Sequence, residues 1–139
     1  MNTLRSALIP GVIAGVISIF GSWFWMAVVF HRFQRQTPET WRPEGPRNYL
    51  GASLLHFLAA IAIASLFTLL VRFNVGPFGV GLAGALEFAL CLWGGIALPI
   101  IVESALFIRL HWLVVLGQLL DWLTTSIAAS LVAGWWLAR

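Results

Sequence analysis

A small set of polar residues lies within stretches of sequence that are otherwise almost wholly apolar. The set comprises His56, Glu87, Glu103, Gln118 and Asp121. An ionisable group at membrane depth costs at least about 2.5–3.5 kcal/mol to insert, so such groups usually face protein or water and mark functional sites. A water-accessible cavity lined by these residues could relay protons or hold a cation. The alternative is an interhelical hydrogen-bond network that only fixes packing, because every buried polar group needs a partner.

The same residues match no established motif for catalysis or metal binding. A His/Asp/Glu set can bind a divalent metal, but metal motifs have tighter spacing, and we expect neither a metal nor a cofactor. His56 has the residue type of an axial ligand to haem or chlorophyll, although a lone buried histidine is more often a hydrogen-bonded packing residue. The sequence has no Ser/His/Asp order in a supporting context, no glycine-rich phosphate loop and no paired-carboxylate site. We therefore expect no enzymatic activity.

The elements that position these residues are predicted to be long apolar helices. Of the 139 residues, 60% are hydrophobic and only 9% are charged, whereas soluble domains carry roughly 25% charged residues. Segments 7–30, 49–71, 78–108 and 112–137 each reach the ~20 residues that a ~30 Å hydrocarbon layer requires. The sequence therefore predicts an all-α, polytopic membrane protein. Residues 1–139 form a single domain of four transmembrane helices in an up-down-up-down bundle within the lipid bilayer.

The connections between the helices predict the orientation of the chain. Two of them are tight, which forces antiparallel neighbours and puts both termini on one side, here called side A. The 31–48 connection then lies on the opposite side, side B. The arginines expected on side A are Arg5, Arg72 and Arg139, and those on side B are Arg32, Arg35, Arg42, Arg47 and Arg109. The positive-inside rule places side B in the cytoplasm. No clustered basic face is present, so we expect no nucleic-acid partner.

Stripes of small residues predict where the helices meet, because close packing of small residues drives helix association in lipid. The glycines expected at these contacts are Gly11, Gly15, Gly94, Gly95 and Gly117. His56, Glu87 and Asp121 lie on the small-residue faces of their helices, so we expect all three to point into protein.

Glu87 and Glu103 cannot both join a single cluster on a straight helix. They are sixteen residues apart, which is about 160° around an ideal helix. They share a face only if Pro99 reorients the helix. Otherwise Glu103 reaches the side B headgroups or pairs with a loop arginine.

A weak internal repeat relates two of the helices. Segment 54–66 can be aligned with segment 119–131, which makes His56 and Asp121 equivalent. This pattern fits two tandem helical hairpins in the same orientation. Chance similarity between two Leu- and Ala-rich helices explains the alignment at least as well.

The order of aromatic and glycine residues also resembles a known family. The resemblance covers nearly the whole chain. Its residues are Gly21-Ser22-Trp23-Phe24-Trp25, Phe30, Trp41, Gly84-Ala85-Leu86, Leu92-Trp93-Gly94 and Phe107. In these features the chain is similar to the bacterial domain of unknown function 1761 family of small membrane proteins. It departs from that pattern at Phe24-Trp25, where a Trp-Tyr pair is common. The resemblance implies a four-helix protein of the bacterial inner (plasma) membrane and assigns no catalytic residue.

Two functions follow as expectations. The first is a non-enzymatic membrane protein, either a self-associating bundle, such as a homo-oligomer, or an accessory subunit of a larger membrane complex. It predicts a dry interior whose polar groups are satisfied. The second is a small oligomeric transporter or channel in which Glu87 or Asp121 is the coupling carboxylate. It predicts a polar cavity open to one side.

Overall fold

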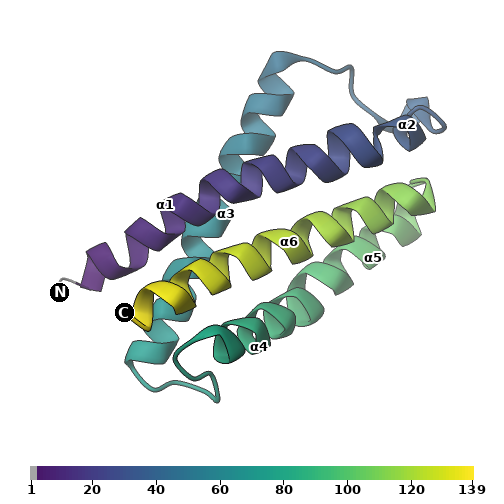
Figure 1. Ribbon diagram of the computed structural model, residues 1–139. Helices are drawn as coiled ribbons and strands as arrows, with labels where there is room; N and C mark the ends of the chain where they lie inside the picture. The colour runs from purple at the N-terminus through teal and green to yellow at the C-terminus, as the bar shows by residue number, and fades with distance from the viewer. Residues whose placement is uncertain (1–2) are drawn as a thin grey trace.

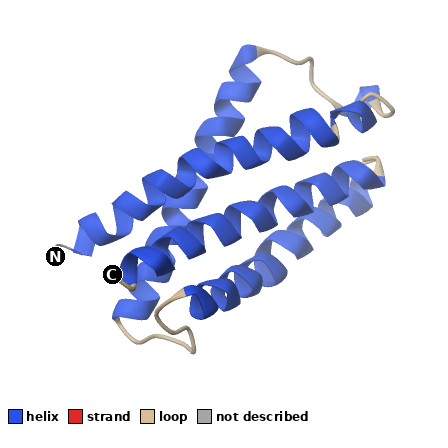
Figure 2. Cartoon of the chain, viewed as in Figure 1, coloured by secondary structure: helices blue, strands red, loops and turns tan. Residues whose placement is uncertain are grey.

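The computed structural model describes residues 3–139, with side chains from residue 7 onward (Figures 1 and 2). Within that part the chain is helical throughout its regular elements and contains no strand. The elements are α1 (Thr3–Ser22), the π-helical segment η1 (Trp23–Val29), α2 (His31–Gln34), the 3₁₀ turn η2 (Pro38–Thr40), α3 (Pro46–Arg72), α4 (Leu82–Leu92), the π-helical segment η3 (Trp93–Ala97), α5 (Leu98–Phe107) and α6 (Trp112–Leu137).

These elements form four helices that are long enough and apolar enough to cross a bilayer. The first is α1 with η1, the second is α3, the third is the continuous rod α4–η3–α5, and the fourth is α6. The all-α four-helix prediction is therefore confirmed. The third helix begins at Leu82 rather than at residue 78, because Gly76 and Gly81 adopt positive φ angles of 83° and 102° and hold a non-helical turn before it.

The third helix changes to a π-helical turn just before Pro99. Pro99 lies at the start of α5, directly after the π segment Trp93–Ala97. A proline ring clashes with the carbonyl four residues earlier, here that of Gly95. The wider π turn removes that conflict without ending the helix.

The helices are not evenly aligned. Figure 1 shows α1, α6 and the α4–α5 rod running side by side, whereas α3 crosses behind them at a steep angle, with both chain termini at one end. All the buried residues of α3 lie between Ala60 and Thr68, in its C-terminal half. The N-terminal half of α3 therefore splays away from the bundle toward side B. Arg5 belongs to α1 on side A, but its side chain lies outside the described residues.

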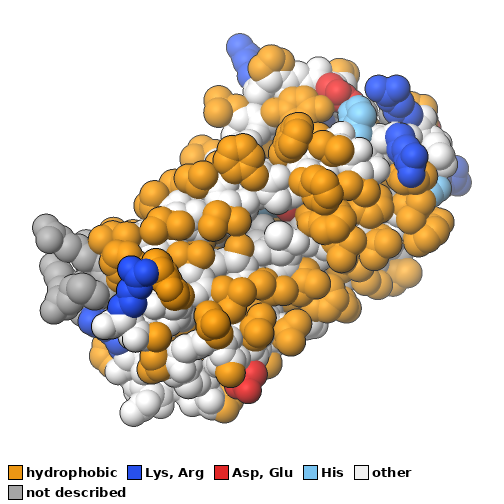
Figure 3. All heavy atoms as spheres, viewed as in Figure 1, with side chains coloured by type: hydrophobic (Ala, Val, Ile, Leu, Met, Phe, Trp, Pro, Cys, Tyr) orange, Lys and Arg blue, Asp and Glu red, His pale blue; other side chains and the backbone are white. Residues whose placement is uncertain are grey.

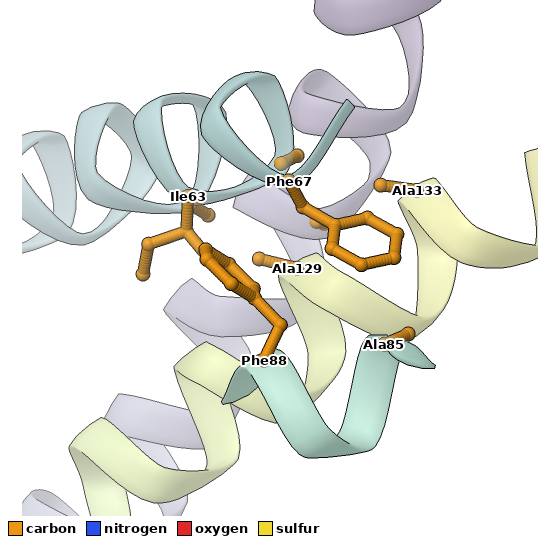
Figure 4. Packing of buried hydrophobic residues seen from close by; sticks show 9 residues of the cluster. Ile63, Phe67, Ala85, Phe88, Ala129 and Ala133 are labelled. Atoms are coloured by element: carbon orange, nitrogen blue, oxygen red, sulfur yellow. The ribbon is translucent and has the colours of Figure 1, made fainter. Parts of the chain in front are cut away.

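The hydrophobic core lies in the side A half of the bundle. Phe67 of α3 and Phe88 of α4 pack with ring centroids 5.4 Å apart. Ala85, Ala129 and Ala133 surround them (Figure 4) and leave room for the rings because their own side chains are small. The side B half has no equivalent cluster among the described buried residues. Packing thus holds the bundle together at one end and leaves space between the helices at the other.

The surface is that of a protein surrounded by lipid. Many large hydrophobic side chains are exposed, including Val12, Val16 and Phe20 on the outer face of α1. In Figure 3 hydrophobic side chains cover the middle of the visible face, and arginine side chains gather toward its ends. A soluble protein rarely exposes a continuous apolar area of this extent.

The glycines predicted at helix contacts fall into two groups. A Cβ atom on Gly11 would lie 2.9 Å from the Cα of Ile61, and one on Gly15 would lie 2.5 Å from the Phe57 ring. Gly117 packs equally closely, with a Cβ position 2.7 Å from the Phe30 ring. These three glycines therefore bring α1 against α3 and α6 against the end of η1.

The prediction for Gly94 and Gly95 is wrong within this chain. Both are exposed, and a Cβ atom on either would meet open space. They lie on the exposed side of η3 and make no close helix contact within the chain.

Candidate functional site

Asp121 is the centre of a hydrogen-bonded cluster that joins three helices. Its side chain is almost fully buried, with 4% of the residue exposed. The Oδ2 atom lies 3.0 Å from Nε2 of His56 on α3 and accepts a hydrogen bond from the Ser22 hydroxyl on α1 at 3.1 Å. At about 1.5 Å per residue, Asp121 lies about 14 Å from the side B end of α6 and His56 about 15 Å from that of α3. The cluster is therefore deep within the bundle.

The hydrogen bonds of His56 determine how many protons the pair holds. Its Nδ1 atom lies 3.0 Å from the backbone carbonyl of Ala52, four residues earlier. A carbonyl can only accept, so Nδ1 carries a hydrogen. The short Nε2–Oδ2 contact then needs one more proton, either on His56 as an imidazolium or on Asp121 as a carboxylic acid. The pair has no net charge in either form, which suits a site remote from water.

Two π-helical segments and their tryptophans hold α6 in register around Asp121. Trp25 in η1 donates from Nε1 to Thr124 Oγ1 at 2.9 Å. Trp93, the first residue of η3, donates from Nε1 to the backbone carbonyl of Leu119 at 2.9 Å. These bonds meet α6 just before and just after Asp121. π segments are rare and recur at functional sites, because they shift side chains out of helical register.

The cluster also contains buried polar atoms that have no hydrogen-bond partner. They are Asp121 Oδ1, Ser18 Oγ one turn from Ser22, and Thr125 Oγ1 one turn from Asp121. Unpartnered buried groups are uncommon and costly in folded proteins. Polar atoms without hydrogen-bond partners therefore remain between α1 and α6, close to the Asp121 carboxylate.

A cavity of about 990 Å³ between α1, α3 and α6 reaches this cluster. It extends to side B and is also open along its side, where the exposed Phe20 and Trp23 line it. Asp121, His56 and Ser22 form its polar end, and Gln118 and Trp122 of α6 line it. Trp122 stacks on the His56 ring with centroids 5.3 Å apart, which fixes the plane of the imidazole. The cavity exists because the N-terminal half of α3 diverges from α1 and α6.

Residues of the 31–48 connection lie at the mouth of the cavity. His31 and Tyr49 line it on the side B end. Glu44 contacts both: its Oε1 lies 3.3 Å from His31 Nε2, and its Oε2 accepts a hydrogen bond from the Tyr49 hydroxyl at 3.0 Å. Glu44 thus bridges the end of the first helix and the start of the second across the cavity mouth.

The structure brings together three of the five predicted site residues. His56, Gln118 and Asp121 line the same cavity. Glu87 and Glu103 do not, and within this chain Glu87 does not point into protein: both glutamates are exposed, on α4 and α5 respectively. Each lies within about two turns of a helix end, where a carboxylate can reach the headgroup region. Glu103 makes no ion pair with any described arginine, including Arg32 and Arg47.

The geometry limits the chemistry of the site. Ser22 and His56 both bind the same carboxylate oxygen rather than each other, so the serine has no adjacent base and is not an activated nucleophile. Both ring nitrogens of His56 have partners, which leaves neither to ligate a haem or chlorophyll metal. Within residues 3–139 no three His, Cys, Asp or Glu side chains are grouped to hold a metal ion. Proton exchange and ligand binding remain as the chemistry that the cluster supports.

The sequence does not indicate the roles of two of these residues. Ser22 and Trp93 belong only to the aromatic and glycine pattern of the resembled family, and nothing in it predicts their bonds to Asp121 and to the Leu119 carbonyl. The aligned repeat made His56 and Asp121 equivalent, but in the structure they contact each other. No family model, curated protein or solved structure matches this chain.

Proposed function

We propose that the chain is the protomer of a small, non-enzymatic membrane transporter in which the His56–Asp121 pair exchanges its shared proton for a cationic ligand. The observation that carries this proposal is the buried pair at the polar end of a large cavity. A bundle serving only as a scaffold would have a dry, fully satisfied interior. Here the cavity ends at a carboxylate whose Oδ1 atom is buried and has no hydrogen-bond partner.

The energetics of the pair do not fix its proton on one partner. At 3.0 Å, the Coulomb attraction of an imidazolium–carboxylate pair is about 5 kcal/mol at an effective dielectric constant of about 20. The desolvation penalty is several kcal/mol for each buried ion. Because the two terms are comparable, neither the charged nor the neutral form dominates by a large margin. We propose that a cation entering next to Asp121 replaces this proton, so that the net charge of the site stays at zero.

The orientation of the cavity follows from the arginines. We propose that the protein crosses the bacterial inner (plasma) membrane and that the 31–48 connection lies in the cytoplasm, in keeping with five arginines on side B against three on side A. The cavity then opens toward the cytoplasm. The resemblance to the domain of unknown function 1761 family supports this membrane, and membership of that family is part of the proposal.

Proton flux in proteoliposomes tests the proposed function. Vesicles with a pH-sensitive dye inside and an imposed pH gradient are challenged with small amines added outside. Free-base amine crosses a bilayer unaided, so protein-free vesicles set the background rate. We expect the wild-type protein to raise amine-dependent proton movement above that background and Asp121→Asn to give the background rate only. Glu103→Gln makes the same chemical change at an exposed site outside the cavity and is the matched control. Flux above the background that survives Asp121→Asn would exclude the proposed exchange.

A second proposed function is self-association, which one specific observation supports. Ala83, Glu87, Cys91 and Gly94 all lie exposed on one face of α4 and η3. A lipid-exposed face rich in small residues suits close contact with another helix. Cys91 is the only cysteine, so oxidative cross-linking in native membranes tests this face without mutation. We expect a disulfide-linked dimer, and a Cys91 that reacts freely with a membrane-permeant maleimide yet never cross-links would argue against it.

A further inference from the structure

A second hollow adjoins the proposed binding cavity. It has a volume of about 330 Å³ and lies between α3 and the η3–α5 part of the third helix. Its walls are almost wholly apolar and include Ala59 and Ala62 of α3 and Ile96 and Ile100 of the opposite helix. Trp122 and Ile101 line both this hollow and the larger cavity. The polar site and the apolar hollow are therefore neighbours that share these two side chains as a common wall.

We infer that the ligand is a single-chain primary alkylamine, whose ammonium group binds Asp121 and whose chain lies in the apolar hollow beyond Trp122. This inference rests on the proposed function and names the class of its ligand. The unpartnered Oδ1 of Asp121 is a hydrogen-bond acceptor, so the head group must donate. The adjoining hollow offers only apolar contacts, so the rest of the molecule must be apolar.

The proton balance favours a primary amine over a quaternary one. When R–NH₃⁺ arrives, the proton shared by Nε2 and Oδ2 leaves to water at the cavity mouth. What remains is neutral His56 with its hydrogen on Nδ1, the Asp121 carboxylate and the ammonium, with no net charge. The contact between Nε2 and Oδ2 then lacks a donor. The N–H groups of a primary ammonium supply donors to both atoms, whereas a quaternary ammonium has none.

The lining of the larger cavity argues against a phospholipid as the ligand. No Arg or Lys lines it, and the only cationic candidate at its mouth, His31, already pairs with Glu44. A phosphate group would therefore enter without a charge partner, at a cost that buried phosphates normally avoid through Arg or Lys contacts. A phosphate-free amine meets no such penalty.

The role of the apolar hollow is steric rather than hydrophobic. An alkyl chain that arrives from the bilayer leaves one apolar environment for another, so its burial gives little free energy. The hollow instead lets the chain stay in an apolar space while the head group reaches Asp121. Filling the hollow should therefore block long-chain amines and leave short ones unaffected.

The test uses the wild-type chain in nanodiscs with ¹³C on the Asp121 carboxyl carbon, which labels one site because Asp121 is the only aspartate. Dodecylamine and butylamine are titrated, and the carboxyl signal reports occupancy. Ala62→Leu fills the hollow, and Val16→Leu on the exposed outer face of α1, which lines neither hollow, is the control. We expect Ala62→Leu to weaken dodecylamine binding at least tenfold and to leave butylamine binding unchanged. Val16→Leu should change neither.

The other outcomes separate the inference from the proposed function. If butylamine binds with proton release but Ala62→Leu leaves dodecylamine unaffected, the chain site is wrong and the exchange stands. If no amine moves the signal, the proposed function falls as well. Equal responses to dodecyltrimethylammonium or dodecanol would overturn head-group recognition. A response to phosphatidylethanolamine in nanodiscs otherwise made of phosphatidylcholine would overturn the choice of a phosphate-free ligand.

Discussion

Replacing Asp121 by asparagine and by alanine should have very different effects on stability. In the wild-type chain Asp121 Oδ2 contacts His56 Nε2 and Ser22 Oγ. Asparagine can place its NH₂ group at the Oδ2 position and donate to both atoms, because His56 in its neutral Nδ1–H form has a free lone pair on Nε2. Alanine makes neither bond and leaves two buried polar groups without partners.

The size of the difference follows from these contacts. Interhelical hydrogen bonds in membranes average about 0.6 kcal/mol and reach about 1–2 kcal/mol in model peptides. Leaving a buried donor or acceptor unpaired costs about 1–3 kcal/mol. We therefore expect Asp121→Ala to lose about 1–3 kcal/mol of unfolding free energy and Asp121→Asn to lose less than about 1 kcal/mol.

The assay is reversible unfolding in mixed micelles, followed by tryptophan fluorescence, with the exposed Glu103→Gln as a control that should match the wild type. The reasoning would be refuted if Asp121→Asn lost as much as, or more than, Asp121→Ala. A loss of about 3–5 kcal/mol is typical of an uncompensated buried charge. It would mean that His56 remains an imidazolium and that the pair is a fixed ion pair rather than one that exchanges a proton.

Three further predictions concern packing, anchoring and orientation. Gly117→Ala should be about 1–3 kcal/mol less stable than Gly94→Ala in the same unfolding assay. A Cβ atom at Gly117 would lie 2.7 Å from the buried Phe30 ring, whereas one at Gly94 meets open space. Equal stabilities of the two variants would contradict the packing described. Trp93→Phe should lose about 0.5–1.5 kcal/mol of unfolding free energy, because the hydrogen bond to the Leu119 carbonyl disappears. Trp112 is exposed, so Trp112→Phe should lose almost none. Similar losses at the two sites would show that the indole hydrogen bond is not stabilising. A reporter fused after Arg139 should be active when it requires the periplasm and inactive when it requires the cytoplasm, since side A is proposed to face outward, and the opposite pattern would reverse the orientation.

The sequence was sufficient for the fold because the signal for each helix is long and apolar. Four segments of adequate length predict four helices, and short connections predict their antiparallel order. Details that depend on backbone geometry were not predictable in this way. The start of the third helix depends on the positive φ of Gly81, and the π segment before Pro99 depends on how a proline is accommodated.

The sequence was less informative about the site, for a physical reason. A small-residue face predicts a close contact but not its partner, which can be a helix of the same chain or another molecule. His56 and Asp121 contact each other within the chain, whereas Glu87, Gly94 and Gly95 are exposed. Ser22 and Trp93 acquire their roles only through the tilt of α3 and the position of α6. The pattern of small and large residues predicts neither the tilt of α3 nor the position of α6.

The central claim is that one proton is shared between His56 and Asp121 and leaves when a cation binds. Labelling the single aspartate with ¹³C tests this directly, since the carboxyl chemical shift distinguishes the protonated or strongly hydrogen-bonded acid from the free carboxylate. The protein in nanodiscs is titrated with butylamine while released protons are counted in weakly buffered solution. We predict a shift of the Asp121 signal together with about one proton released per bound amine. An unchanged signal, or binding without proton release, would contradict the account.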